Sequence, residues 1–426
     1  MKREPTVPRP RIRRAETEKK ETARPFTGKG MGTGFSTVEA PWKAGLQAAK
    51  DALSKIEKVK PDLALGFVTS GYDLQAVAKG FSQGVGKDVP LVGAAVHGIL
   101  FTEDTIIDRG VAIAAFKNDN LKFVTAVGRN LAQSLHKALE EAVIPVVDQL
   151  HTRRAEGFNY LTIFLLLDSY VNGDILVDDV AKILDQAEEG LKFFGGILDS
   201  SEISRETALV YNNEVIHGGV ICIGIYSKTP LGMGYGHGLY PLVPKRATKV
   251  SGNIIYQFDG RPAFEVWKEY LMKKGVDERE ISENLGHYLG KYQFGIPDPA
   301  VPKYPKVRLA MSVTREGGIR LAGDIPENST VWLMEARKER MIETVGRAVF
   351  NAIEELEETP PFGAIVLEGF PRLLSLGKDF NDEIEAVQRK LGIPLIGFNT
   401  YGEILRPKPT QKWFHNSSLI ISVLPE

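Results

Sequence analysis

The stretch Leu231–Leu271 reads LGMGYGHGLYPLVPKRATKVSGNIIYQFDGRPAFEVWKEYL. Its first part places glycine at every second position, at Gly232, Gly234, Gly236 and Gly238. Because alternate residues of a strand share one face, that face would carry no side chains, which costs backbone entropy and packing. The pattern therefore indicates that a flat neighbour, either another backbone or a ligand, lies close against the strand. A glycine-rich loop without a defined face is the alternative.

Further along the same stretch, Asp259-Gly260 predicts a tight turn. Pro262 suits the first turn of a helix over Ala263–Leu271, since the N–H that proline lacks has no helical partner at that position. The stretch also carries a resemblance, through the following residues: His237-Gly238, Pro241, Gly252-Asn253, Tyr256, Asp259-Gly260-Arg261-Pro262-Ala263 and Tyr270. This run resembles the junction between the two halves of FIST proteins.

The resemblance to the FIST family extends from about Gly34 to Glu426. It implies a sensory or ligand-binding module with an N-terminal and a C-terminal domain. We expect a FIST N-terminal-like α/β domain over 30–228 and a FIST C-terminal-like α/β domain over 229–426. Residues 1–29 are rich in Arg, Lys, Glu and Pro and nearly free of large apolar residues, which predicts a disordered basic and polar tail.

Composition excludes several classes of protein. The chain has 426 residues, 43% of them hydrophobic, and a formal net charge of −1, so no global field favours nucleic acid. The single cysteine, Cys222, excludes an intramolecular disulfide framework and a cysteine-based zinc site. No uninterrupted apolar run approaches the ~20 residues that span a bilayer, and the N-terminus has no apolar core of a signal peptide. We expect a cytoplasmic protein that binds neither nucleic acid nor membrane.

A strand–helix–strand pattern recurs three times along the chain. The first copy contains Val-Pro-Leu-Val-Gly at 89–93, and the last contains Ile-Pro-Leu-Ile-Gly at 393–397. A looser middle copy runs from the apolar segment Leu161–Leu167 to Val220–Ile225. Such internal similarity predicts an α/β fold class, with mixed sheets covered by helices and built from duplicated β-α-β units. Alternatively, the pattern arises without duplication, because any α/β crossover produces it.

Catalytic signatures are missing from the sequence. It contains no G-x-S-x-G nucleophile elbow, no phosphate-binding G-x-x-x-x-G-K-[ST] and no close histidine pair for a metal. We therefore expect a non-catalytic protein without a metal site. An enzyme with an unfamiliar site remains the alternative, with Asp168, Glu403 or His415 as acid or base.

Two candidate ligand clusters follow apolar strands in the first part of the chain, where open α/β sheets place ligands. The first cluster is Ser70, Gly71, Tyr72 and Asp73, although Asp73 can equally be a helix cap. The second begins at Gly93 and includes His97. FIST proteins usually carry two threonines and a Gly-Glu pair here, whereas this chain reads Ala94-Ala95-Val96-His97-Gly98-Ile99. His97 therefore implies a changed ligand or a lost contact, and a histidine bonded to backbone is the alternative.

A third cluster resembles the end of the FIST C-terminal domain. It comprises Tyr401, Gly402, Glu403, His415 and Asn416. A partly desolvated Glu403 carboxylate would hold an ammonium group, Tyr401 would supply a ring or a hydroxyl, and Asn416 can both donate and accept. A structural turn is the alternative.

Arg372 completes this set. At this place the family has Ser-Cys-x-Gly-Arg, whereas this chain reads Glu368-Gly369-Phe370-Pro371-Arg372. Arg372 would pair with a ligand carboxylate. Because the cysteine is missing, any thiol chemistry of the family cannot be transferred to this chain.

His237, between Gly236 and Gly238, has a separate interpretation. Some FIST proteins are regarded as haem-binding gas sensors, and a histidine on a flat glycine surface is a plausible axial ligand. A histidine in a sheet more often bonds to backbone or to a neighbouring side chain.

The sequence thus predicts a FIST-type sensor that binds a small polar ligand such as an amino acid, in a cleft between its halves, and signals to a separate protein. The alternatives are a haem-dependent nitric-oxide sensor, an enzyme and an interaction scaffold.

Overall fold

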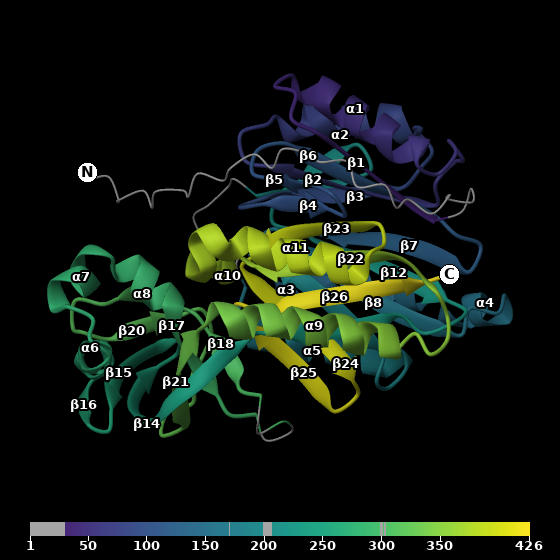
Figure 1. Ribbon diagram of the computed structural model, residues 1–426. Coiled ribbons are helices and arrows are strands. Elements are labelled where there is room, and N and C mark those ends of the chain that lie inside the picture. Colours follow the sequence, from purple (N-terminus) through teal and green to yellow (C-terminus); the bar gives the residue numbers. More distant parts are fainter. Residues whose placement is uncertain (1–29, 170, 199–206, 299–300, 302–303) are drawn as a thin grey trace. The chain divides into compact units, whose positions relative to one another are not determined.

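The structure is a computed structural model that describes residues 30–169, 171–198, 207–298, 301 and 304–426 (Figure 1). The tail predicted for 1–29 lies outside the described residues. The described chain forms two compact units. The larger unit contains residues 30–237, 342–370 and 384–426, and the smaller one contains 238–341 and 371–383.

The chain repeats one order of elements three times: strand, helix, strand, helix, strand, hairpin, strand. The first repeat contains β1 (Gly30–Ser36), α1 (Pro41–Ser54), β2 (Leu63–Thr69), α2 (Leu74–Val85), β3 (Leu91–Val96), β4 (Leu100–Thr102), β5 (Ile106–Ile107) and β6 (Val111–Lys117). The second contains β7 (Leu121–Gly128), α3 (Leu135–Val147), α4 (Leu150–Ala155), β8 (Tyr160–Leu167), α5 (Gly173–Ala187), β9 (Lys192–Ile197), β10 (Ala208–Tyr211), β11 (Glu214–Ile216) and β12 (Val220–Ser227). The third contains β13 (Gly232–Gly236), α9 (Lys338–Glu354), β22 (Pro361–Gly369), α10 (Phe370–Leu376), the 3₁₀ turn Gly377–Asp379, α11 (Phe380–Leu391), β23 (Leu395–Thr400), β24 (Gly402–Lys408), β25 (Gln411–His415) and β26 (Leu419–Pro425).

Each repeat builds one six-stranded sheet, and the three sheets have the same strand order. The orders are β1-β6-β2-β3-β10-β11, β7-β12-β8-β9-β24-β25 and β13-β26-β22-β23-β4-β5. In each sheet one pair of neighbouring strands is parallel: β2 with β3, β8 with β9, and β22 with β23. The last strand of each repeat pairs antiparallel with the first strand of that pair. This order confirms the predicted α/β class and agrees with duplicated β-α-β units.

The hairpins are exchanged between repeats in a cycle. The hairpin of the first repeat, β4-β5, pairs with β23 of the third. The hairpin β24-β25 of the third repeat pairs with β9 of the second, and β10-β11 of the second pairs with β3 of the first. Each sheet is therefore completed by a segment from another repeat, so none of the three sheets can form in full from one repeat alone.

Gly232, Gly234 and Gly236 lie in strand β13, as the pattern predicted, whereas Gly238 lies beyond its end with φ +68. The flat neighbour of Gly232 and Gly234 is the backbone of helix α9. A Cβ on Gly232 would lie 1.8 Å from the carbonyl oxygen of Ala352, and one on Gly234 would lie 1.7 Å from that of Ala348. Strand β1 approaches α1 in the same way through two glycines of its own. The glycine face thus serves close helix–sheet packing, and Figure 1 shows α1 and α2 together over the sheet that contains β1 and β2.

The sheets of the first and third repeats contact each other through aromatic side chains. Phe67 of β2 stacks on Phe398 of β23, with ring centroids 4.0 Å apart. Both residues are fully buried. This contact brings together the regions that follow β2, β3, β22 and β23, which are the regions where the sequence placed its ligand clusters.

Most of the smaller unit comes from the chain between β13 and α9, and residues 371–383 complete it. Its strands are β14 (Leu239–Ser251), β15 (Ile254–Phe258), β16 (Arg261–Pro262), β17 (Tyr292–Ile296), β18 (Lys306–Arg308), β19 (Ala310–Val313), β20 (Ile319–Leu321) and β21 (Thr330–Ala336), and its helices include α6 (Ala263–Lys273), α7 (Glu278–Glu283) and α8 (Leu285–Lys291). Asp259 and Gly260 both have positive φ, which confirms the predicted turn, and Pro262 is the N-cap of α6.

Among the described helices, none is both long and apolar enough to cross a membrane.

Candidate functional site

Four partly exposed side chains converge after the parallel strands of the first and third repeats. Ser70 follows β2, His97 follows β3, Phe370 follows β22 and Tyr401 follows β23. The Ser70 hydroxyl lies 3.2 Å from Nδ1 of His97. The rings of His97 and Tyr401 meet edge to face with centroids 5.9 Å apart, and Phe370 packs against Tyr401 at 4.8 Å. We call Ser70, His97, Phe370 and Tyr401 the rim; three of them were predicted from the sequence as ligand residues.

A buried hydrogen-bond network lies directly beneath Tyr401. Glu403 is 1% exposed, and its carboxylate accepts from the Thr400 hydroxyl at 2.7 Å and from the Ser418 amide at 2.8 Å. Asn416 donates to the Tyr401 carbonyl at 2.9 Å. These bonds hold the backbone on both sides of Tyr401, so they position the rim.

Asn399 links the first and third repeats and was missed in the sequence. Its side-chain oxygen accepts from the Ile99 amide at 2.7 Å, and its amide group donates to the Glu368 carbonyl at 3.1 Å. The residue is 2% exposed within the buried strand β23. An asparagine in an otherwise apolar strand is the signal that sequence reasoning could have used, because buried amides require partners.

Ser418 is the second residue that sequence reasoning missed. Its amide donates to Glu403, and its carbonyl accepts from Gly369 at 2.8 Å. Its hydroxyl is buried and has no hydrogen-bond partner within the described part of the chain. A buried hydroxyl without a partner costs free energy, so this atom is suited to meet a ligand or an ordered water.

Of the remaining residues of the first two clusters, Asp73 and Gly93 have structural contacts. Asp73 caps α2 by accepting from the Ala76 amide at 3.0 Å. Gly71 has φ +97 with no neighbouring atom where a Cβ would stand, and Gly93 faces the backbone of Gly66 without room for a side chain. Burial raises the pKa of the Tyr72 phenol, with an opposing effect from Arg109.

His237 and His415 are buried next to each other. Each is 4% exposed, and their ring centroids lie 6.1 Å apart. Trp413 packs its edge against His415 at 5.8 Å and against Tyr235 at 4.9 Å. Because these rings are packed on one another, a haem could bind to either imidazole only after neighbouring side chains moved. The residues present therefore do not fit an axial haem site.

Other predicted residues lie apart from the rim or have packing roles. Gly236 is buried at the end of β13, and Gly402 faces the Phe414 ring, which a Cβ would approach to 2.5 Å. Gly238, with φ +68, and Arg372 belong to the smaller unit. Arg372 is fully buried there and pairs with the equally buried Glu383, with Nε 3.3 Å from Oε2.

Asp168, a candidate acid or base, accepts from the Gly218 and Gly219 amides at 2.8 Å each. Burial raises the pKa of its carboxyl above the ordinary value, while these amides oppose the rise. Within the described ranges, no group of three or more His, Cys, Asp or Glu side chains is placed to hold a metal ion.

The chain has distant similarity to other proteins. An uncharacterized protein of Methanocaldococcus jannaschii is 23% identical over 237 residues, covering 55% of this chain and 45% of the relative. The chain thus spans less than half the length of that relative. Among solved structures, Thermotoga maritima PurL complexed with ADP matches 93% of this chain and 71% of its own at 12% identity, with a TM-score of 0.21. PurLQS from Thermotoga maritima matches 94% of this chain and 75% of its own at 12% identity, with a TM-score of 0.22. TM-scores this low establish no shared fold.

Two family models match the chain in succession. The FIST N domain model matches residues 62–261, and the FIST C domain model matches residues 263–406. The boundary between the two matches falls in the Asp259–Ala263 segment that carried the resemblance. Since the two matches together cover most of the sequence, the chain belongs to the FIST family.

Proposed function

We propose that this protein is a non-catalytic FIST-type sensor that binds a small polar molecule at the rim and passes the bound state to a separate protein. FIST domains are associated with sensory and ligand-binding roles. The observation that carries the proposal is the convergence of Ser70, His97 and Tyr401 from two repeats, at the strand ends where open α/β sheets bind ligands.

The chemistry of the rim favours a ligand that carries a carboxylate. The hydroxyls of Ser70 and Tyr401 and the neutral His97 imidazole carry three donor hydrogens, one of which is used in the bond between Ser70 and His97. An ionised oxygen accepts the strongest hydrogen bonds from the remaining donors. Phe370 and Tyr401 add an apolar wall for the rest of the ligand. A small amino acid has both features, so it remains the class that we propose.

The pair first expected to bind an amino acid, Glu403 and Arg372, is occupied by protein groups. Glu403 accepts from Thr400 and Ser418, and Arg372 pairs with Glu383. Glu403 is also 1% exposed, so a ligand ammonium could reach it only if the groups that bury it moved. The rim side chains, in contrast, are partly exposed, so a ligand could reach them from solvent.

A thermal-shift screen of the full chain against amino acids, polyamines and nucleotides tests the proposal. A ligand at about a hundred times its Kd stabilises by roughly 2.7 kcal/mol, which raises Tm by several degrees in a domain of this size. We expect a shift confined to small carboxylate-bearing compounds. No shift with any class would contradict the small-molecule function and favour a protein ligand.

Variants of the rim locate the site. We expect His97→Ala and Tyr401→Phe each to weaken the ligand that the screen identifies by about tenfold, since each removes one direct hydrogen bond worth about 1.5 kcal/mol to a charged group. The matched control is His151→Ala, because His151 is exposed on α4 and distant in sequence from the rim. Isothermal titration of the three variants gives the Kd values. Equal losses in all three would contradict a site at the rim.

A further inference from the structure

The four rim residues belong to one row that continues from the sheet of β2 and β3 into the sheet of β22 and β23. The register of β2 with β3, extended by one residue, places Ser70 opposite His97. The chain then crosses to the other sheet as β4, and the register of β4 with β23 places His97 opposite Tyr401. The register of β22 with β23 places Tyr401 opposite Phe370. The contacts between these side chains follow the same order.

Arg109 is the next member of this row beyond Ser70. Strand β6 is the antiparallel neighbour of β2, on the side away from β3. The Thr69 amide donates to the Gly110 carbonyl at 3.0 Å, and the Gly110 amide donates to the Thr69 hydroxyl at 2.8 Å, so the pairing continues past both strands. The next step of this register places Arg109 opposite Ser70. Opposite residues share a face, with Cβ atoms about 4.5–5.5 Å apart.

Arg109 gives this end of the row a positive charge. It is exposed, and it forms no ion pair with any residue that the structure describes. Burial raises the pKa of the Tyr72 phenol, an effect that Arg109 opposes and Glu39 reinforces. Because Tyr72 follows Ser70 by two residues, this electrostatic effect places the guanidinium charge near the Ser70 end of the row.

We infer that Arg109 binds the carboxylate of the rim ligand and makes the site selective for carboxylates. A guanidinium presents two parallel N–H donors that match the two oxygens of a carboxylate. Ser70 and His97 lie next along the row, and the rings of Tyr401 and Phe370 at its other side receive the apolar part of the ligand. The inference rests on the proposed sensor site and supplies the charged residue that the four rim side chains lack.

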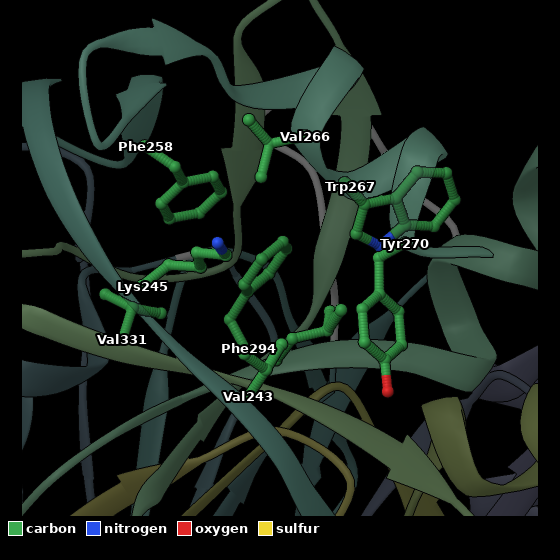
Figure 2. Close-up of a pocket in the computed structure, with 9 residues that line it drawn as sticks. Val243, Lys245, Phe258, Val266, Trp267, Tyr270, Phe294 and Val331 are labelled. Carbon is green, nitrogen blue, oxygen red and sulfur yellow. The ribbon is translucent and has the colours of Figure 1, made fainter. Parts of the chain in front are cut away.

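A pocket in the smaller unit offers no alternative place for such a ligand. It lies between helix α6 and the sheet, and Figure 2 shows the aromatic side chains that line it. Phe258 and Phe294 stack on each other with ring centroids 5.7 Å apart, and both are 2% exposed. These rings pack against each other, so no ligand ring fits between them.

Titration of the full chain with an acid and its amide tests the inference. 3-Phenylpropanoate and 3-phenylpropanamide have nearly the same shape and differ in charge, and ligand-detected NMR measures Kd. For a fragment of this size we expect a Kd on the order of 1 mM for the acid. The amide should bind about tenfold more weakly, because a charge-assisted pair with Arg109 is lost. An amide that binds as tightly as the acid would overturn the inference.

Variants of Arg109 assign the preference to this side chain. Arg109→Gln should weaken the acid about tenfold and leave the amide unchanged, so the preference disappears. Arg109→Lys keeps the charge without the paired donors and should weaken the acid about threefold. The matched control is Arg347→Gln, because Arg347 is 61% exposed on α9, and this variant should change neither Kd. The exposed position of Arg109 predicts an unchanged Tm for both of its unliganded variants.

His97→Ala separates this inference from the proposed sensor site. Weaker binding of the acid in both His97→Ala and Arg109→Gln supports the two together. Weaker binding in His97→Ala alone would keep the ligand at the rim and overturn the role of Arg109. An acid that binds equally well to both variants would overturn the rim site itself, and no binding of the acid at about 10 mM would overturn both.

Discussion

Replacement of Gly234 by alanine is expected to destabilise the larger unit by about 3 kcal/mol or more. An alanine Cβ would lie 1.7 Å from the Ala348 carbonyl oxygen and 2.5 Å from its carbonyl carbon. Both atoms belong to the backbone of helix α9, so no side-chain rotation relieves the overlap, and the helix must move away from strand β13. Urea unfolding of the variant, followed by circular dichroism, measures the loss.

Gly346→Ala is the matched control, because Gly346 lies in the same helix on a roomier side. An alanine there would contact the flexible end of Lys390 at 3.4 Å, which is ordinary van der Waals contact. Alanine is favoured over glycine inside a helix by up to about 1 kcal/mol, so this variant should be as stable as the parent or more stable. If Gly234→Ala unfolded at the urea midpoint of the parent, the close approach of β13 and α9 would be wrong.

The glycine pattern shows what the sequence can predict about this fold. The spacing of Gly232 and Gly234 predicted a strand with a bare face and a flat neighbour, and the neighbour is Ala348 and Ala352 of α9. A glycine indicates that something approaches closely, but the identity of that neighbour depends on tertiary packing far along the chain. In this case the smaller unit separates the two partners in sequence.

The sequence could not predict the exchange of hairpins, for a related reason. Strands β4, β10 and β24 each pair with a strand of another repeat. The apolar alternation of a strand specifies which face is buried and carries no information about which sheet edge it joins. The repeats could be recognised from local patterns, whereas their connection could not.

The candidate site was predicted in part. The rule that polar residues after parallel strands share one end of a sheet identified Ser70, His97 and Tyr401, and the stacking of Phe67 on Phe398 brings their strands together. Residue type alone did not indicate which polar side chains would already be hydrogen-bonded to other protein groups. Glu403 and Arg372 looked like ligand groups in the sequence, and both have protein partners that only the folded chain supplies.

Replacement of Arg372 by methionine should destabilise the protein by about 3–5 kcal/mol, because it leaves the buried Glu383 without its cation. Both side chains are fully buried, and Nε of Arg372 donates to Oε2 of Glu383 at 3.3 Å while Nη2 bonds to Oε1. Arg261→Met gives the comparison in the same unit, since Arg261 and Glu269 form a pair whose side chains are 56% and 41% exposed. Loss of that exposed pair should leave the urea midpoint close to that of the parent. Urea unfolding measures both changes.

A double variant, Arg372→Met with Glu383→Met, separates a structural role from a binding role. Replacing a whole buried pair by apolar residues of similar volume is often neutral or stabilising, so the double variant should recover most of the lost stability. Because the proposed ligand site is the rim, the recovered protein should also retain the thermal shift of the parent with the ligand that the screen identifies. A double variant that folds but no longer responds to that ligand would assign the ligand carboxylate to Arg372 and contradict the placement at His97 and Tyr401. A double variant as unstable as Arg372→Met alone would show that Arg372 stabilises the fold through groups other than Glu383.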